Sequence, residues 1–139
     1  YKHNSSAKCQ PKSFEKVEEI VNNFTPEDAR VHKMWGKLQQ LMQIDKMIAV
    51  EVAHCPQSYA CLLWSSTHGN IVYSGDTLPC QNLENYAQNA KLLIHEATFE
   101  DGLEEDARLK RHCTTSQAID MGVRAKVWRI VLTHLSPRY

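Results

Sequence analysis

Four short apolar segments in the second half of the chain each end in side chains that can bind a metal ion. They are MIAVEVAH (47–54) with His54, NIVYSGD (70–76) with Asp76, LLIHE (92–96) with His95 and Glu96, and RIVLTH (129–134) with His134. Runs of this length, rich in Val, Ile and Leu and followed by polar residues, are typical of β-strands. The chain must therefore fold around a sheet with chemically reactive strand ends.

Helical patterns surround and separate these strands. Apolar residues recur at helical spacing over 13–24 and 26–44, and further helices are predicted over 81–89, 102–111 and 114–125. Thr114 and Gln117 have the spacing of a capping box. Another strand is predicted over 59–66. Because strands and helices alternate in the second half, the sequence favours a layered α/β sheet.

Composition excludes several classes of protein. The 139 residues carry no net charge, so nothing attracts the whole chain to nucleic acid or membrane. The five cysteines are scattered without a CxxC pair, which argues against a disulfide framework and fits a reducing, intracellular compartment. No apolar run approaches the roughly 18–20 residues of a membrane helix, and no signal peptide is visible.

Strand ends in α/β sheets gather at one edge, where ligands bind. Imidazole and carboxylate groups suit zinc and related metals, and a carboxylate such as Asp76 can bridge two ions. Simpler interpretations stay open. Asp76 can cap the helix after Pro79, a single strand-end histidine is usually an ordinary polar residue, and a core position with satisfied hydrogen bonds is the preferred interpretation of His95. The pattern alone predicts a possible metal site.

Four motifs identify a family resemblance. They are VYSGDTLPC (72–80), LLIHEATFEDGLEEDA (92–107), HCTTSQAI (112–119) and LTHLSPRY (132–139). In this order and spacing they resemble the carboxy-terminal half of the long form of tRNase Z, the zinc-dependent endonuclease that trims the 3′ end of precursor tRNA. The resemblance is dense from His54 to Tyr139. It implies a metallo-β-lactamase fold, a four-layer αββα sandwich of which this chain supplies mainly the second half.

The resemblance also implies two regions and a set of metal ligands. Residues 1–45 are expected to form a polar segment and helical linker, and residues 46–139 the carboxy-terminal part of the metallo-β-lactamase domain. His54 is expected to bind one zinc ion, His134 the second, and Asp76 both.

Further roles follow from the same resemblance. His112 is expected to be catalytic without binding metal, assisting departure of the 3′ oxygen, and Glu96 to orient its imidazole. Thr114 and Arg138 are expected to contact substrate. Three cations before His112 either contact phosphates or lie on a solvated helix face: Arg108, Lys110 and Arg111.

The chain departs from the family in three respects, one of which is that Leu135 and Pro137 stand in the final motif where phenylalanine and glutamine are frequent. Cys113 stands where the family usually has serine, and the HxHxDH motif that supplies the other metal-site groups is absent from these residues. We expect that motif upstream, so the isolated chain should be inactive and should expose a sheet face that favours self-association. The expected activity of the intact protein is phosphodiester hydrolysis that removes the 3′ trailer and leaves a 3′-hydroxyl on the tRNA.

The expected partners are precursor tRNA and either a second copy of the chain or the amino-terminal half of the same protein. No membrane association is expected. The expected location is the nucleus, the mitochondrion or both. Two alternatives remain: a non-catalytic, RNA-binding half of such a protein, and another hydrolase of the same fold acting on a small ester or thioester.

Overall fold

The computed structural model describes residues 29–136, so the predicted helix over 13–24 and the expected substrate residue Arg138 lie outside the described residues. The elements follow in the order α2 (Ala29–Met42), β1 (Lys46–Glu51), β2 (Tyr59–Trp64), β3 (Ile71–Tyr73), α3 (Gln81–Tyr86), β4 (Leu92–Glu96), α4 (Glu104–Lys110), α5 (Thr115–Arg124) and β5 (Ile130–Thr133). Every strand and helix predicted within this range is confirmed. Most of the strands end before the polar residues that we assigned to their ends.

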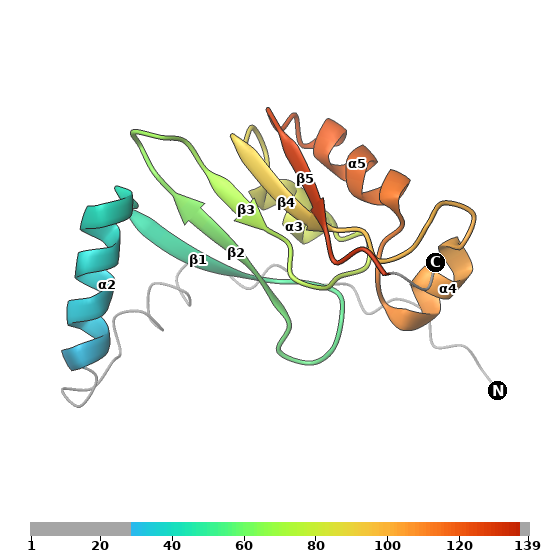
Figure 1. Ribbon diagram of the computed structural model, residues 1–139, viewed down its shortest axis with the longest axis horizontal. Coiled ribbons are helices and arrows are strands. Elements are labelled where there is room, and N and C mark those ends of the chain that lie inside the picture. Colours follow the sequence, from blue (N-terminus) through green and yellow to red (C-terminus); the bar gives the residue numbers. More distant parts are fainter. Residues whose placement is uncertain (1–28, 137–139) are drawn as a thin grey trace.

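The five strands form one sheet whose spatial order is the same as their order along the chain. β1 pairs with β2, and β2 with β3, in antiparallel fashion, whereas β3, β4 and β5 are mutually parallel. Consequently β1, β3, β4 and β5 all run in the same direction (Figure 1). Their carboxyl ends meet at one edge of the sheet, which is the arrangement that the strand-end pattern required.

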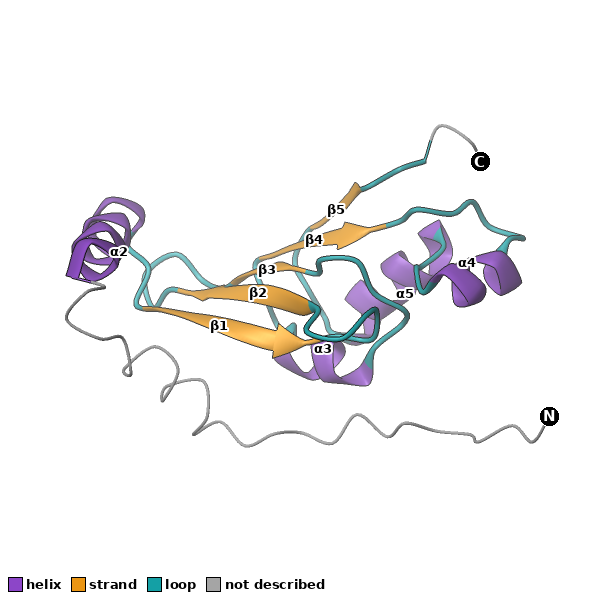
Figure 2. Ribbon diagram, turned by 90° about the horizontal axis from the view of Figure 1, so that it is seen from below, coloured by secondary structure: helices purple, strands orange, loops and turns teal. Residues whose placement is uncertain are grey.

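Helices α3, α4 and α5 lie on one side of the sheet (Figure 2). Val72 of β3 and Leu93 of β4 are fully buried on that side, against Leu83 of α3 and Met121 of α5. Alternation along each strand places every second side chain in this core. The helices therefore hold the sheet rigidly behind the edge where the strands end.

The other face of the sheet is open and apolar. Met47, Tyr73 and Val131 are 43%, 47% and 49% exposed, and the register aligns Met47 with Leu63 and Val131 with Ile94. An apolar face of this kind marks a surface made for contact.

The capping box predicted at the start of α5 is confirmed. The Thr114 hydroxyl accepts a hydrogen bond from the Gln117 backbone N–H, and the Gln117 side chain accepts one from the Thr114 N–H. Asp101 reinforces this end of the helix by accepting hydrogen bonds from the backbone N–H and hydroxyl of Ser116. Among the described helices, none has the length and apolar character needed to cross a membrane.

Candidate metal centre

The common strand edge brings five potential metal-binding side chains together. His54 follows β1, Asp76 follows β3, Glu96 ends β4, and His134 follows β5, while His112 lies between α4 and α5. Their ligand atoms form two overlapping groups, His54–Asp76–His112 and Glu96–His112–His134, and within each group all ligand atoms lie within 4.8 Å of one another. All the strand-end residues that we predicted as metal ligands therefore converge.

The turn after β3 requires glycine. Gly75 has a φ of +59°, and a β-carbon there would lie 2.9 Å from the backbone oxygen of Tyr59. The turn leaves Asp76 with Oδ1 3.6 Å from Nδ1 of His134. The N-cap of α3 is Cys80, and no side chain caps it. The alternative in which Asp76 caps the following helix is therefore wrong.

Glu96 is a buried hub that connects three loops, with only 1% of its surface exposed. Oε1 accepts from the Thr77 N–H at 2.9 Å and from Nδ1 of His112 at 2.8 Å. Oε2 accepts from the Thr98 N–H and hydroxyl and from the Cys113 N–H. Burial alone raises the pKa of Glu96, but the hydrogen bonds from Thr77, Thr98 and His112 together bring it below its ordinary value. The group is thus a carboxylate at neutral pH.

The tautomers of His54 and His112 follow from their partners. Nδ1 of His54 lies 2.8 Å from the backbone oxygen of Arg111, and Nδ1 of His112 bonds the carboxylate of Glu96. Carbonyl and carboxylate oxygens only accept, so each Nδ1 carries the proton. Each neutral ring therefore has its free lone pair on Nε2.

A hydrogen bond with Thr98 fixes the same tautomer in His134. The Thr98 hydroxyl gives its single proton to Glu96, and it lies 2.7 Å from Nδ1 of His134. It must accept there, so His134 also carries its proton on Nδ1. Histidines that bind metals ordinarily hold their second nitrogen in such a hydrogen bond.

Comparison with known proteins gives the family. No protein-family model matches the chain. The mouse protein named zinc phosphodiesterase ELAC protein 2 is 42% identical over 133 residues, which is 96% of this chain and 15% of the mouse protein. The mitochondrial tRNase Z TRZ3 of Arabidopsis thaliana is 44% identical over 106 residues, or 69% of this chain and 12% of that protein.

The chain belongs to the tRNase Z family. A crystal structure of a long-form RNase Z from yeast superposes with a TM-score of 0.65 at 32% identity, over 77% of this chain and 15% of the yeast chain. The metallo-β-lactamase fold protein YhfI from Bacillus subtilis superposes at 23% identity with a TM-score of 0.59, over 66% of this chain and 37% of that one. The sheet and its helices are therefore part of a metallo-β-lactamase fold. The chain spans only about one seventh of the length of its mouse relative.

The donor set of this tRNase Z chain fits a metal ion. It combines imidazole nitrogens with carboxylate oxygens, the ligand types that zinc and its neighbours take in proteins. The oxygen partners of the three Nδ1 atoms supply the outer shell that orients such ligands.

Two residues of this tRNase Z chain are buried beside the centre. His95 is 1% exposed, and its Nδ1 lies 2.6 Å from the backbone oxygen of Glu96, so the interpretation as a core histidine is confirmed. Burial lowers the pKa of His95. Cys113 donates its thiol proton to the backbone oxygen of Thr77 at 3.0 Å, and burial raises the pKa of that thiol. The cysteine therefore keeps a hydrogen-bond donor at this position.

Two residues expected to contact substrate or phosphate have structural partners instead. The side chain of Thr114 is fully buried and caps α5, so the structure assigns it to the helix and not to direct contact with substrate. Arg108 pairs with Glu105 on the surface of α4.

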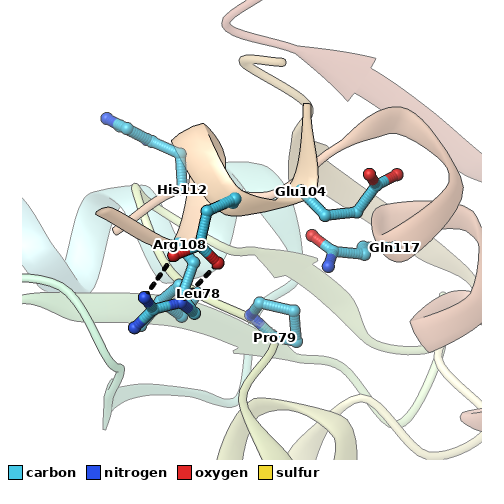
Figure 3. Close-up of a pocket in the computed structure, with 7 residues that line it drawn as sticks. Leu78, Pro79, Glu104, Arg108, His112 and Gln117 are labelled. Atoms are coloured by element: carbon cyan, nitrogen blue, oxygen red, sulfur yellow. Dashed lines mark hydrogen bonds and ion pairs between the residues drawn. The ribbon is translucent and has the colours of Figure 1, made fainter. Parts of the chain in front are cut away.

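A shallow pocket of about 340 Å³ borders His112. Its lining includes Leu78, Pro79, Gln117 and the Arg108–Glu105 pair (Figure 3). The volume falls within the range of small-ligand sites. The pocket therefore has room for a small ligand beside the imidazole of His112.

The sequence did not single out Thr98, and it suggested a phosphate contact or a solvated helix face for Arg111, not the contact with His54 that the structure shows. Thr98 lies in the HEAT motif two residues after Glu96, and that spacing was the signal that could have identified it. Arg111 acts on His54 partly through its backbone oxygen, which any residue possesses. No residue type predicts such a contact.

Proposed function

We propose that this chain supplies part of the active site of a zinc-dependent endoribonuclease. The intact protein would remove the 3′ trailer from precursor tRNA by phosphodiester hydrolysis and leave a 3′-hydroxyl on the tRNA. The observation that carries the proposal is the gathering of three histidines and two carboxylates at one sheet edge, in two groups whose ligand atoms lie within 4.8 Å of one another: His54–Asp76–His112 and Glu96–His112–His134. The relatives named tRNase Z and zinc phosphodiesterase support it.

We assign His54, Asp76 and His134 to two zinc ions, with Asp76 shared between them. When bound, the ions would lower the pKa of a coordinated water to near ~7 and attract charge on the phosphate. The remaining ligands would come from a motif outside these residues, so we expect the isolated chain to hold zinc poorly and to be inactive.

His112 is the proposed general acid. Its Nδ1–H stays bonded to Glu96, so the proton that it can give to the substrate is one on Nε2. That Nε2–H would be donated to the departing 3′ oxygen of the tRNA. Glu96 then fixes the orientation of the ring without touching the substrate.

The substrate would extend from this centre in two directions. The pocket beside His112 can receive part of a nucleotide next to the cleaved bond. Arg138, four residues after His134, would contact a substrate phosphate.

The proposal extends to the architecture and location of the intact protein. Residues 46–139 would form one part of the metallo-β-lactamase domain and residues 1–45 a polar segment and helical linker. The open sheet face would pack against the sheet of the amino-terminal half of the same protein or against a second copy. The Arabidopsis relatives are named mitochondrial, which favours the mitochondrion alongside the nucleus.

The test uses the intact protein and a precursor tRNA labelled in both its body and its trailer. We expect a tRNA product with a 3′-hydroxyl, loss of cleavage with a chelator, recovery with zinc, and no cleavage by Asp76→Ala. Tight RNA binding without cleavage would instead show that the chain belongs to a non-catalytic, RNA-binding half. Hydrolysis of a small ester or thioester without RNA cleavage would show that the protein is a different hydrolase of the same fold.

A further inference from the structure

Arg111 and His54 exchange two hydrogen bonds across 57 residues of sequence. Nδ1 of His54 lies 2.8 Å from the backbone oxygen of Arg111, and the Arg111 guanidinium donates to the backbone oxygen of His54 at 2.6 Å. Both acceptors are carbonyl oxygens, so the direction of each bond is determined. One bond orients the imidazole ring, and the other holds the backbone that carries it.

The backbone of Arg111 has a conformation that would favour glycine at this position. Arg111 ends α4 in the left-handed conformation, with φ 62° and ψ 44°. Glycine adopts that conformation freely, whereas a residue with a β-carbon is disfavoured by roughly 1–2 kcal/mol. If only the turn mattered, glycine would serve better here. The bond from the guanidinium to His54 gives a physical reason for a long side chain at this position.

Arg111 also connects His54 to His112. The His112 N–H bonds the backbone oxygen of Ala107, which closes the turn around Arg111, and the rings of His54 and His112 have centroids 4.9 Å apart. A displacement of Arg111 would therefore reach both imidazoles at once.

We infer that Arg111 is a positioning residue for the metal centre. Its backbone oxygen holds His54 in the Nδ1–H tautomer, and its guanidinium ties the backbone of that ligand to the segment that carries His112. The inference rests on the proposed function only in taking His54 as a zinc ligand. It assigns the guanidinium to the protein's own backbone and not to an RNA phosphate.

Three variants of the intact protein test the inference. Arg111→Gly removes the guanidinium and suits the left-handed backbone, Arg111→Lys keeps the positive charge without the planar fork, and Lys110→Ala removes a neighbouring exposed cation as the matched control. Zinc affinity is measured by competition with a chelator, and the tautomer of His54 by nitrogen chemical shifts in the metal-free protein. Neither measurement involves RNA, so neither depends on whether the protein cleaves tRNA.

We expect Arg111→Gly to bind zinc about 10-fold to 100-fold more weakly, the range seen when outer-shell partners of metal ligands are removed. The tautomer of His54 should be unchanged, because the backbone oxygen of residue 111 that accepts from its Nδ1 is also present in glycine. Arg111→Lys should show a smaller loss of zinc affinity, and Lys110→Ala none. Thermal unfolding of the metal-free variants checks that each one folds.

Two results would overturn the inference. One is unchanged zinc affinity in Arg111→Gly, combined with RNA binding whose salt dependence falls by about one phosphate contact. That result would make Arg111 a phosphate ligand. The other, which applies even if Arg111→Gly fails to fold, is an Arg111→Lys protein identical to the wild type in zinc affinity.

Discussion

Nδ1 of His112 lies 2.8 Å from Oε1 of Glu96, a carboxylate that is only 1% exposed. A carboxylate oxygen only accepts hydrogen bonds, so this contact keeps a proton on Nδ1 of His112. Exchange of a proton with any molecule in the centre is therefore confined to Nε2 of His112.

Replacing Glu96 with glutamine should damage both folding and catalysis. An amide presents a donor where the carboxylate only accepts, so at least one of the groups on Thr77, Thr98, His112 or Cys113 loses its acceptor in a buried place. The free energy of unfolding should fall by about 1–3 kcal/mol for each group left unsatisfied. Urea denaturation measures this loss, and equal midpoints for the two proteins would contradict it. In the intact protein cleavage should also slow, because the ring of His112 loses the carboxylate that orients it.

Asp76→Ala and His112→Ala should fail in different ways in the intact protein. Asp76→Ala should lower bound zinc, because one carboxylate would serve both ions. His112→Ala should keep its zinc and slow cleavage by about 10²–10⁴-fold, the usual contribution of a general acid. Metal analysis combined with single-turnover kinetics separates the two effects. An empty metal site in His112→Ala would make His112 a ligand.

Gly75→Ala should destabilise the protein more than Gly102→Ala. Both glycines have positive φ angles, +59° and +94°, but only at Gly75 would the new β-carbon meet backbone, the oxygen of Tyr59 at 2.9 Å. Both variants should lose about 1 kcal/mol from the left-handed conformation, and Gly75→Ala should lose more because the two loops must separate. Thermal unfolding of the pair gives the comparison. Equal losses would show that the loops move apart freely.

The elements of this fold could be predicted from sequence because apolar residues recur at the spacing of a helix in segments such as 114–125 and form short apolar runs in strands such as 92–96. The convergence of His54, Asp76 and His134 was also predictable, since their strands share one direction. The orientation of the imidazoles was not, because it depends on a hydroxyl of Thr98 and a backbone oxygen of Arg111. Thr114 has the residue type of a substrate contact, yet its burial depends on the bridge between Phe99 and Thr114, a contact between segments that local patterns do not encode.

His95 should make stability depend on pH. Burial lowers its pKa in the folded protein below the ordinary value of 6.5, so the unfolded chain binds a proton first as pH falls. Stability from this group is complete above about pH 6.5 and declines below it, by at most about 1.4 kcal/mol per pH unit, until the folded pKa is passed. His95→Gln should be less stable than the wild type at pH 7.5 but show a flatter decline. Urea denaturation at pH 7.5, 6.5 and 5.5 tests this, and parallel curves for the two proteins would refute it.

Cys113 should resist alkylation in the native protein, while Cys55 reacts. Cys55 is exposed, whereas Cys113 is buried and bonded to Thr77, and burial raises the pKa of its thiol. Since the thiolate is the reactive form, iodoacetamide at pH 7.5 should modify Cys55 and leave Cys113 unmodified until the protein is unfolded. Peptide mass spectrometry with and without urea distinguishes the two residues. Rapid native modification of Cys113 would mean that this loop opens readily.

The strands β1 to β5 lie side by side in the sheet in the order in which they are synthesised. On a ribosome, each strand can therefore join an edge that has already formed. His134 follows the last of these strands, so its side chain is the final member of the centre to arrive. A nascent chain can thus build most of this sheet before the side chain of His134 is available to the candidate metal centre.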